Sequence, residues 1–264
     1  YGVPVINEEN TIPIYIMGSY NNDAWLWDKV HYDFPYYIQV VSAGNDGGNS
    51  YSGGTKNGYD KLTGEKNSKN NLVVANARDA VINPDGSGEL LSVFINESSS
   101  QGPSDDARIK PDITGNGTGV FSTFADADNS YSTISGTSMA APNVAGSALL
   151  LQQHSQNLFN EYMLSATLKG LILHTADDAG LEGPDANFGW GLMNAKRAAE
   201  TLSSKDNGAI INPLSLFPNQ SYTIEVESNN VDDLLASISW TDPAGQSSTS
   251  INLDTASLVN DLDI

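Results

Sequence analysis

The stretch Ser135–Pro142, SGTSMAAP, sets a small, hydroxyl-rich turn directly before an apolar run. From about Gly136 to Gln153 the chain shows a helical pattern without a polar face, which predicts a central, buried helix. Ser138 would then lie at a helix N-terminus, among small neighbours and beside backbone N–H groups that favour negative charge. A nucleophilic serine needs that environment. A helix cap formed by Ser138 and Thr137 explains the shorter sequence GTS equally simply.

The position of Pro142 favours the first interpretation. A proline inside a buried helix removes a backbone hydrogen bond. A chain selected only for packing would have little reason to keep it there. The sequence therefore marks Ser138 as a candidate catalytic residue.

Strands and helices alternate along the chain on both sides of this stretch. Buried strands are predicted at 37–42, 70–77 and within 106–117, and the glycine-rich segment GNG ends the last of them. Further helices are predicted within 24–30, at 162–174 and at 194–202. This alternation predicts an α/β fold with a mainly parallel sheet flanked by helices.

The composition and the hydrophobic pattern of the sequence change near Ser203. SSKDNGAIINP, at 203–213, has the composition of a linker, and the segments at 220–230 and 234–245 alternate with period two. We therefore predict two domains, an α/β domain at 1–204 and a C-terminal antiparallel β-sandwich at 205–264. The sandwich would be partial, because such domains usually have about 100 residues.

The composition narrows the classes of partner. The chain has 264 residues, 32 of them acidic and 12 basic, for a formal charge of −20. That charge argues against nucleic acid and against anionic membrane surfaces, and it favours a well-solvated surface. The sequence has no cysteine, so disulfides and thiolate chemistry are excluded, and it has no apolar run long enough to span a membrane.

The segment SGTSMAAPNVAG resembles the serine motif of the subtilisin-like serine peptidases, the subtilases. Four more segments resemble this family in the family's order: VVSAGNDGG at 40–48, SSSQGPSDDARIKPDITGNG at 98–117, LKGLILHTADDAG at 168–180 and GPDANFGWGLMNAKRAAE at 183–200. The resemblance covers roughly residues 1–202. Beyond it, ISWTDP and SLVNDLDI look like the start of the β-sandwich that follows the catalytic domain in some secreted bacterial subtilases.

The resemblance implies roles for particular residues. Ser138 matches the nucleophile, and Asn45 matches the asparagine whose side-chain amide donates to the oxyanion together with the Ser138 backbone N–H. Ser42, Ala43 and Gly44 match the wall of the pocket for the side chain before the scissile bond. YGVPV resembles the opposite substrate-binding strand, which places Gly2 on the facing wall.

The base that such a serine needs is missing. The family carries its aspartate in an Asp-[Ser/Thr]-Gly motif and its histidine in His-Gly-Thr-His, and this chain has neither motif. His154 follows Ser138 by 16 residues on the same predicted helix, about 24 Å along its axis. His174 is expected as a packed or capping residue, and His31 as an exposed loop residue.

Two functions remain open. The first is a serine endopeptidase acting on extended protein or peptide substrates, with its triad aspartate and histidine upstream or on a separate chain. The second is a non-catalytic protein, either a pseudo-protease or a module that binds a saccharide or a partner. Relatives with a Glu-Asp-Ser site fit poorly, because they carry an aspartate where Asn45 stands.

The resemblance also implies an extracellular, secreted protein whose chemistry needs no cofactor. Structural calcium is a secondary expectation, with oxygens from DADNS at 126–130 or DPAG at 242–245. Without the first strands of the fold, sheet edges and apolar faces would be exposed, so low stability is predicted for the chain alone.

Overall fold

A three-stranded parallel sheet forms the centre of the computed structural model, which describes residues 16–49, 59–228, 231, 233–250 and 252–264. The strand order is β1-β2-β5, with β1 at Val40–Ser42, β2 at Leu72–Ala77 and β5 at Ile113–Asn116. Val41 pairs with Val73 in β2, and Val74 pairs with Ile113 in β5. Every residue of β2 is buried, as expected for a central strand covered on both faces.

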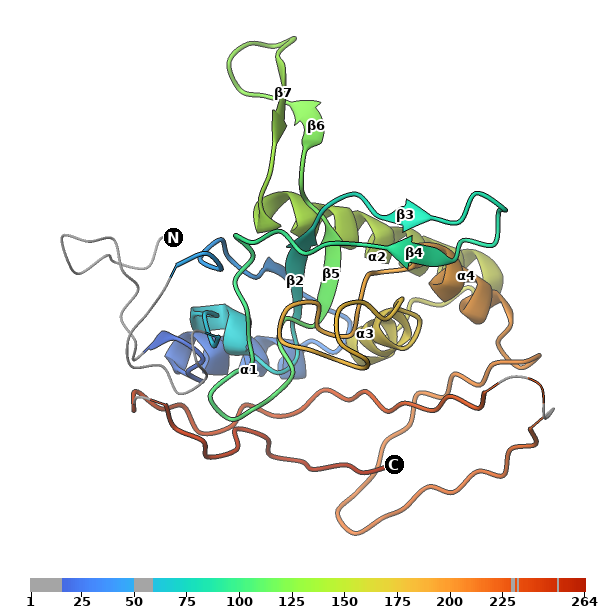
Figure 1. The fold of residues 1–264 in the computed structure, drawn as a ribbon. Coiled ribbons are helices and arrows are strands. Elements are labelled where there is room, and N and C mark those ends of the chain that lie inside the picture. Colours follow the sequence, from blue (N-terminus) through green and yellow to red (C-terminus); the bar gives the residue numbers. More distant parts are fainter. Residues whose placement is uncertain (1–15, 50–58, 229–230, 232, 251) are drawn as a thin grey trace.

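Within the described part of the chain, four α-helices accompany this sheet (Figure 1). They are α1 at Asn22–Asp33, α2 at Thr137–Phe159, α3 at Ser165–His174 and α4 at Ala195–Ser203, and a short 3-10 helix, η2, spans Gly64–Asn67. Helix α2 contacts all three strands, and α3 and α4 pack against α2. The main core lies between these elements and contains Val74, Ile113, Val144, Leu168 and Leu202 among others. The predicted fold class, a parallel sheet flanked by helices, is confirmed.

Helix α2 differs from the prediction in its length and its exposure. It extends to Phe159, and it is buried on one side only: Leu149 is 71% exposed and Leu150 is 66% exposed. The expectation of a helix buried all round was therefore wrong. A run of apolar letters cannot show whether a second layer covers the far side of a helix. Among the described residues, no helix is both long enough and apolar enough to cross a membrane.

Two antiparallel hairpins extend from the α/β body. One joins β3 at Val81–Ile82 to β4 at Leu90–Ser92, and the other joins β6 at Val120–Thr123 to β7 at Tyr131–Ile134. The second hairpin rises beyond the N-terminal end of α2 and stands clear of the sheet (Figure 1). The strands carry mostly exposed side chains, so their sequences show little burial pattern by which to predict them.

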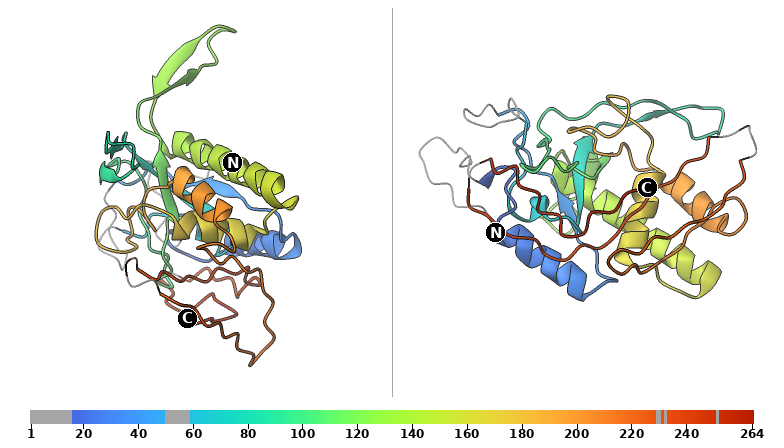
Figure 2. Two further views of the ribbon diagram at one scale, coloured as in Figure 1. Left: turned by 90° about the vertical axis from the view of Figure 1, so that its right-hand side faces the viewer. Right: turned by 90° about the horizontal axis from the view of Figure 1, so that it is seen from below.

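The described C-terminal residues do not confirm the sandwich predicted at 205–264. Their described part contains no strand ladder; it runs as extended chain beneath the α/β body (Figure 2). Residues 221–228 alternate in sequence, yet all of them are exposed. An alternating strand is stabilised by burying one face against a second sheet, and the described residues offer these segments none.

Candidate active site

Asn45 lies in the loop that follows β1, and a glycine shapes this loop. Gly44 has a φ of +110°, a conformation that disfavours other residues. A Cβ at Gly44 would approach Ser100 Oγ to 2.9 Å. The same hydroxyl accepts a hydrogen bond from the backbone N–H of Asp46 at 3.0 Å. The loop is therefore held against Ser100, and Asn45 stands exposed at its tip.

Ser138 is the second residue of α2 and its side chain is exposed. Gly136 precedes the helix, and its backbone N–H donates to the carbonyl of Gly117, just beyond β5, at 2.9 Å. A Cβ on Gly117 would come within 2.6 Å of the Gly136 oxygen, so only glycine allows this approach. Asn45 follows β1, and the start of α2 is held beside the end of β5, so both residues are placed by carboxyl ends of parallel strands, where α/β proteins commonly bind ligands.

Thr137 joins the two loops. Its backbone N–H donates to Asn45 Oδ1 at 3.0 Å, and its hydroxyl lies 3.2 Å from the same oxygen. The hydroxyl in turn accepts from the backbone N–H of Gly44 at 3.1 Å. Thr137 is fully buried, so its end of this bridge is shielded from water. Because Oδ1 is engaged by Thr137, the Asn45 side chain has its Nδ2 donor available on the other side of its amide plane.

The bridge brings Asn45 close to the start of α2. A Cβ on Gly136 would lie 3.5 Å from Asn45 Oδ1 and 3.6 Å from Nδ2. Asn45 and Ser138 are 93 positions apart in the sequence, and Thr137, directly before Ser138, connects them. Sequence reasoning missed Thr137 as more than a cap residue, because its partners come from a distant loop.

The predicted pocket wall lies beside this cluster. Ser42 ends β1 and is half-buried, Ala43 is buried, and the Ala43 N–H continues the sheet by donating to Val74 at 2.9 Å. Their role in substrate binding stays a prediction. Gly2, the predicted facing wall, lies outside the described residues.

The contacts of the three histidines are with residues other than Ser138. His31 was wrongly expected in an exposed loop: it is fully buried in α1, and its ring stacks on Tyr37 at 5.6 Å. Burial lowers its pKa to about 4. The ring of His154, within α2, bonds to Ser203 at 2.8 Å, and that of His174, the last residue of α3, bonds to Ser237 at 2.9 Å.

A buried charge cluster holds the opposite ends of the strands. Asp112, just before β5, accepts from the backbone N–H of Val73 at 2.7 Å, and it pairs with Lys110 at 2.5 Å and Lys169 at 2.8 Å. Burial alone would raise the pKa of Asp112, but the two ammonium groups keep it lowered. Burial lowers the pKa of Lys110 to about 7. This cluster fixes β2 against β5 and thereby the loops at their far ends.

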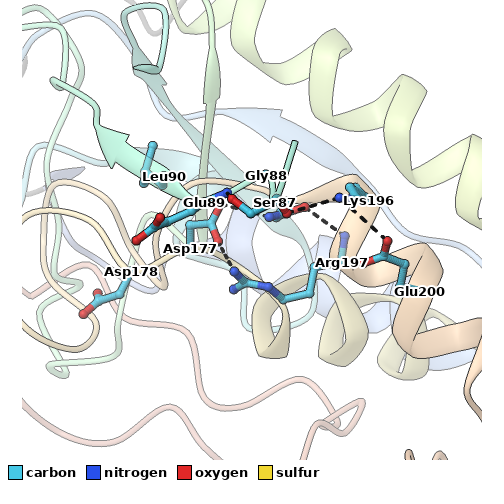
Figure 3. A pocket seen from close by; sticks show the side chains of 10 residues that line it. Ser87, Gly88, Glu89, Leu90, Asp177, Asp178, Lys196, Arg197 and Glu200 are labelled. Atoms are coloured by element: carbon cyan, nitrogen blue, oxygen red, sulfur yellow. Dashed lines mark hydrogen bonds and ion pairs between the residues drawn. The ribbon is translucent and has the colours of Figure 1, made fainter. Parts of the chain in front are cut away.

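A polar cavity of about 360 Å³ lies apart from Ser138, between the β3–β4 hairpin and α4 (Figure 3). Its charged side chains largely pair with one another. Arg197 forms an ion pair with the mostly buried Asp177 at 2.7 Å, and Lys196 donates to the carbonyl of Ser87 at 3.2 Å. Neither Ser138 nor Asn45 lines it.

Within the described ranges, no three His, Asp or Glu side chains gather to hold a metal ion, and calcium binding stays a prediction.

Comparison with known proteins agrees with this architecture. A family model described as the subtilase family matches residues 16–191. A C5a peptidase of Streptococcus pyogenes serotype M3 is 35% identical over 153 residues, which are 54% of this chain and 12% of that protein. The autotransporter lipoprotein NalP of Neisseria meningitidis serogroup B is 43% identical over 65 residues, 25% of this chain and 6% of that protein.

A solved structure, the prenylagaramide maturation protease PagA, aligns with a TM-score of 0.51 at 20% identity, covering 71% of this chain and 58% of that one. At that identity the likeness concerns the fold. The match of the family model is what defines the class, the subtilisin-like serine peptidases. The family model covers well over half of the sequence, and the chain belongs to the subtilase family.

Proposed function

We propose that this chain supplies the nucleophile and the oxyanion donors of a serine endopeptidase. Ser138 Oγ attacks the carbonyl carbon of a peptide bond, and the amine product leaves as an acyl-enzyme forms. Water then releases the acyl group as a carboxylate and regenerates the serine. The backbone N–H of Ser138 and Nδ2 of Asn45 donate to the oxygen that becomes negative in each step.

One observation carries the proposal. Thr137 holds Asn45 Oδ1 with its N–H at 3.0 Å and is the residue directly before Ser138. An amide fixed in this way needs little reorganisation when negative charge develops beside it, which is the physical basis of oxyanion stabilisation. A helix cap would not need a second loop tied to the same residue.

The acid–base half of the proposed site lies outside the 264 residues. A serine hydroxyl is a weak nucleophile until a base takes its proton. None of the three histidines is in contact with Ser138 in the structure: His31 is buried in α1, His154 bonds to Ser203 and His174 bonds to Ser237. We place the histidine and its orienting aspartate on further polypeptide, either of the same gene product or of a separate chain. The matched residues make up 12% of the streptococcal relative, so a longer polypeptide has precedent among its relatives.

A fluorophosphonate probe tests the proposal directly. The full-length gene product should become covalently labelled, and peptide mapping should place the label on Ser138. The Ser138→Ala variant should lose the label, whereas Ser135→Ala, which removes a nearby exposed hydroxyl, should keep it. Absence of labelling at Ser138 in folded full-length protein would refute the proposed chemistry.

The same histidine assignments favour a second candidate, a non-catalytic pseudo-protease or binding module. It predicts that no part of the full-length protein supplies a base, and that folded protein binds peptides without cleaving them.

Substrates of the proposed peptidase would be proteins or peptides bound in extended form. We propose an extracellular location, which is consistent with a relative named as an autotransporter lipoprotein. The proposed chemistry needs no cofactor.

A further inference from the structure

Asparagine is followed directly by glycine three times in this chain, at Asn57–Gly58, Asn116–Gly117 and Asn207–Gly208. In such a pair the backbone nitrogen of the glycine can attack the side-chain carbonyl carbon of the asparagine. Both atoms then belong to one five-membered ring, and glycine has no side chain to hinder the approach. The first pair lies outside the described residues, and the other two lie in contrasting surroundings.

Asn207 and Gly208 form the tip of the turn that follows α4, where the chain leaves the α/β body (Figure 1). The Asp206 N–H donates to the carbonyl of Ala209 at 2.8 Å, and the Ala209 N–H donates to the carbonyl of Ser204 at 3.1 Å. Gly208 has a φ of +114°, and a Cβ placed on it would meet nothing within 4 Å. The pair is therefore surrounded by open space.

Both reacting groups of this pair are free. Within the described ranges, the Gly208 N–H has no hydrogen-bond acceptor and the Asn207 side chain has no partner. Both residues are exposed, so hydroxide can reach the Gly208 N–H. An exposed side chain changes rotamer rapidly, which lets the Asn207 Cγ atom turn toward the glycine nitrogen.

The pair Asn116–Gly117, at the end of β5, is held at both reacting groups. The Gly117 N–H donates to the carbonyl of Ala77 at 3.2 Å. The Asn116 side-chain oxygen accepts from the backbone N–H of Thr118 at 3.2 Å, and its Nδ2 donates to Asp79. Closing a ring here would break these hydrogen bonds. This pair is thus a matched control within the same molecule.

We propose that Asn207–Gly208 is a site of spontaneous modification, at which Asn207 is converted to isoaspartate and aspartate through a succinimide. The Gly208 nitrogen loses its proton and bonds to the Asn207 Cγ atom, and the side-chain nitrogen leaves as ammonia. Water then adds to one of the two ring carbonyls and opens the ring. Attack at the backbone carbonyl gives isoaspartate, whose main chain runs through Cβ, and attack at Cγ gives aspartate.

The modification would alter the turn in two ways. Isoaspartate adds one methylene to the backbone inside a turn that is closed by hydrogen bonds to Ser204, including one from the Asn207 N–H at 2.9 Å. Either product also adds one negative charge next to Asp206. The conversion therefore weakens the connection between α4 and the C-terminal residues, and it accumulates with the age of the protein.

The test uses the full-length gene product in the Ser138→Ala form, which prevents self-digestion during a long incubation at mildly alkaline pH. Folded protein and protein in guanidinium chloride are digested at intervals and analysed by mass spectrometry. In the folded protein, Asn207 should deamidate at least about tenfold faster than Asn116, because ring closure at Asn116 must first break its hydrogen bonds. In guanidinium chloride the two should react at similar rates. Equal rates for the two residues in the folded protein would overturn the inference.

The identity of the product tests the route. An isoaspartyl methyltransferase used as a reagent should label residue 207 of the aged protein. The variant Asn207→Gln should lose this label, because a glutamine would have to close a six-membered ring. The matched control Asn212→Gln should keep it, since Asn212 is also exposed but precedes a proline, which has no N–H. Deamidation of Asn207 to aspartate alone, without isoaspartate, would mean direct hydrolysis and would refute the succinimide.

Discussion

The Asn45 side-chain oxygen accepts a hydrogen bond from the backbone N–H of Thr137 at 3.0 Å, across 92 positions of sequence. This contact makes the orientation of one loop depend on the start of a helix. The hydroxyl of Thr137 adds a further contact to each loop residue, Asn45 and Gly44. Thr137 is therefore a positioning residue for the proposed oxyanion donor.

Replacing Thr137 by valine should slow acylation of Ser138. The variant keeps the shape and the backbone N–H but loses the hydroxyl bonded to Gly44 and Asn45. We expect a decrease of about 3–10-fold in the labelling rate, because the two lost hydrogen bonds are neutral and act on the oxyanion donor only through its position. Thr137→Ser should stay near the wild-type rate. Asn45→Ala should cost about 10²–10³-fold, a magnitude established on subtilisin. Equal rates for Thr137→Val and wild type would show that the backbone contact suffices.

Gly44→Ala should impair the loop through a specific contact. A Cβ at this position would lie 2.9 Å from Ser100 Oγ, and the φ of +110° is unfavourable for alanine. The matched control is Gly86→Ala, which has a φ of +86° but open space around the new methyl group. Both variants should lose thermal stability, and only Gly44→Ala should also slow labelling of Ser138. If both slowed labelling equally, general strain rather than loop geometry would be responsible.

Acid should destabilise the protein in part through His31. Burial lowers its pKa to about 4, and the ammonium groups of Lys169 and Lys110 act in the same direction. In the unfolded chain the pKa is about 6.5, so between pH 6.5 and pH 4 the unfolded state binds more protons and stability falls as the pH falls. The loss can reach about 3 kcal/mol.

The variant His31→Phe should reduce that acid dependence. Phenylalanine keeps an aromatic ring against Tyr37 but binds no proton. Urea denaturation at several pH values between 4 and 7 measures the slope. His154→Gln is the control and should retain the steeper slope of the wild type. A slope unchanged in His31→Phe would show that other groups dominate in this range.

Asp242 should be critical for stability despite its place in the irregular C-terminal part. It is 1% exposed, and its carboxylate pairs with Lys69 at 2.5 Å and accepts from the N–H groups of Val259 and Asn260 at 2.8 Å. Asp242→Ala leaves the buried Lys69 ammonium without a carboxylate to balance its charge, which costs about 3–5 kcal/mol. We expect the melting temperature to drop by roughly 6–20 °C. Asp254→Ala, an exposed neighbour, should shift it little.

The sequence predicted the elements whose signals are local. The predictions of helix α4 and of the buried strands β2 and β5 are confirmed. The spacing of apolar residues and the length of an apolar run depend only on how that one element is buried. Helix α1 was located, but its buried side is polar, with Asp28 and His31 inside and Leu26 46% exposed. This inversion hid the burial of His31.

The site was predictable in its residues and not in its connections. Ser138 and Asn45 could be identified from the sequence because glycines and other small residues beside them shape both loops. The same small residues carry the resemblance to the family motifs. The bridging role of Thr137 depends on a contact between distant loops. The exposure of Leu149 and Leu150 depends on which layers cover α2. The periodicity of the sequence predicts neither this exposure nor the contact made by Thr137.

The hydrogen bonds of Lys69 and Asn70 also determine where this protein can be truncated. Lys69 Nζ donates to the carbonyls of Pro243 and Ser257, and the Asn70 side chain exchanges two hydrogen bonds with the Asp242 backbone. Composition places a border near residue 204, but a protein trimmed there would lose every one of these attachments at the entrance to the central strand. Recombinant work on the protease region should therefore retain the chain through Asn260.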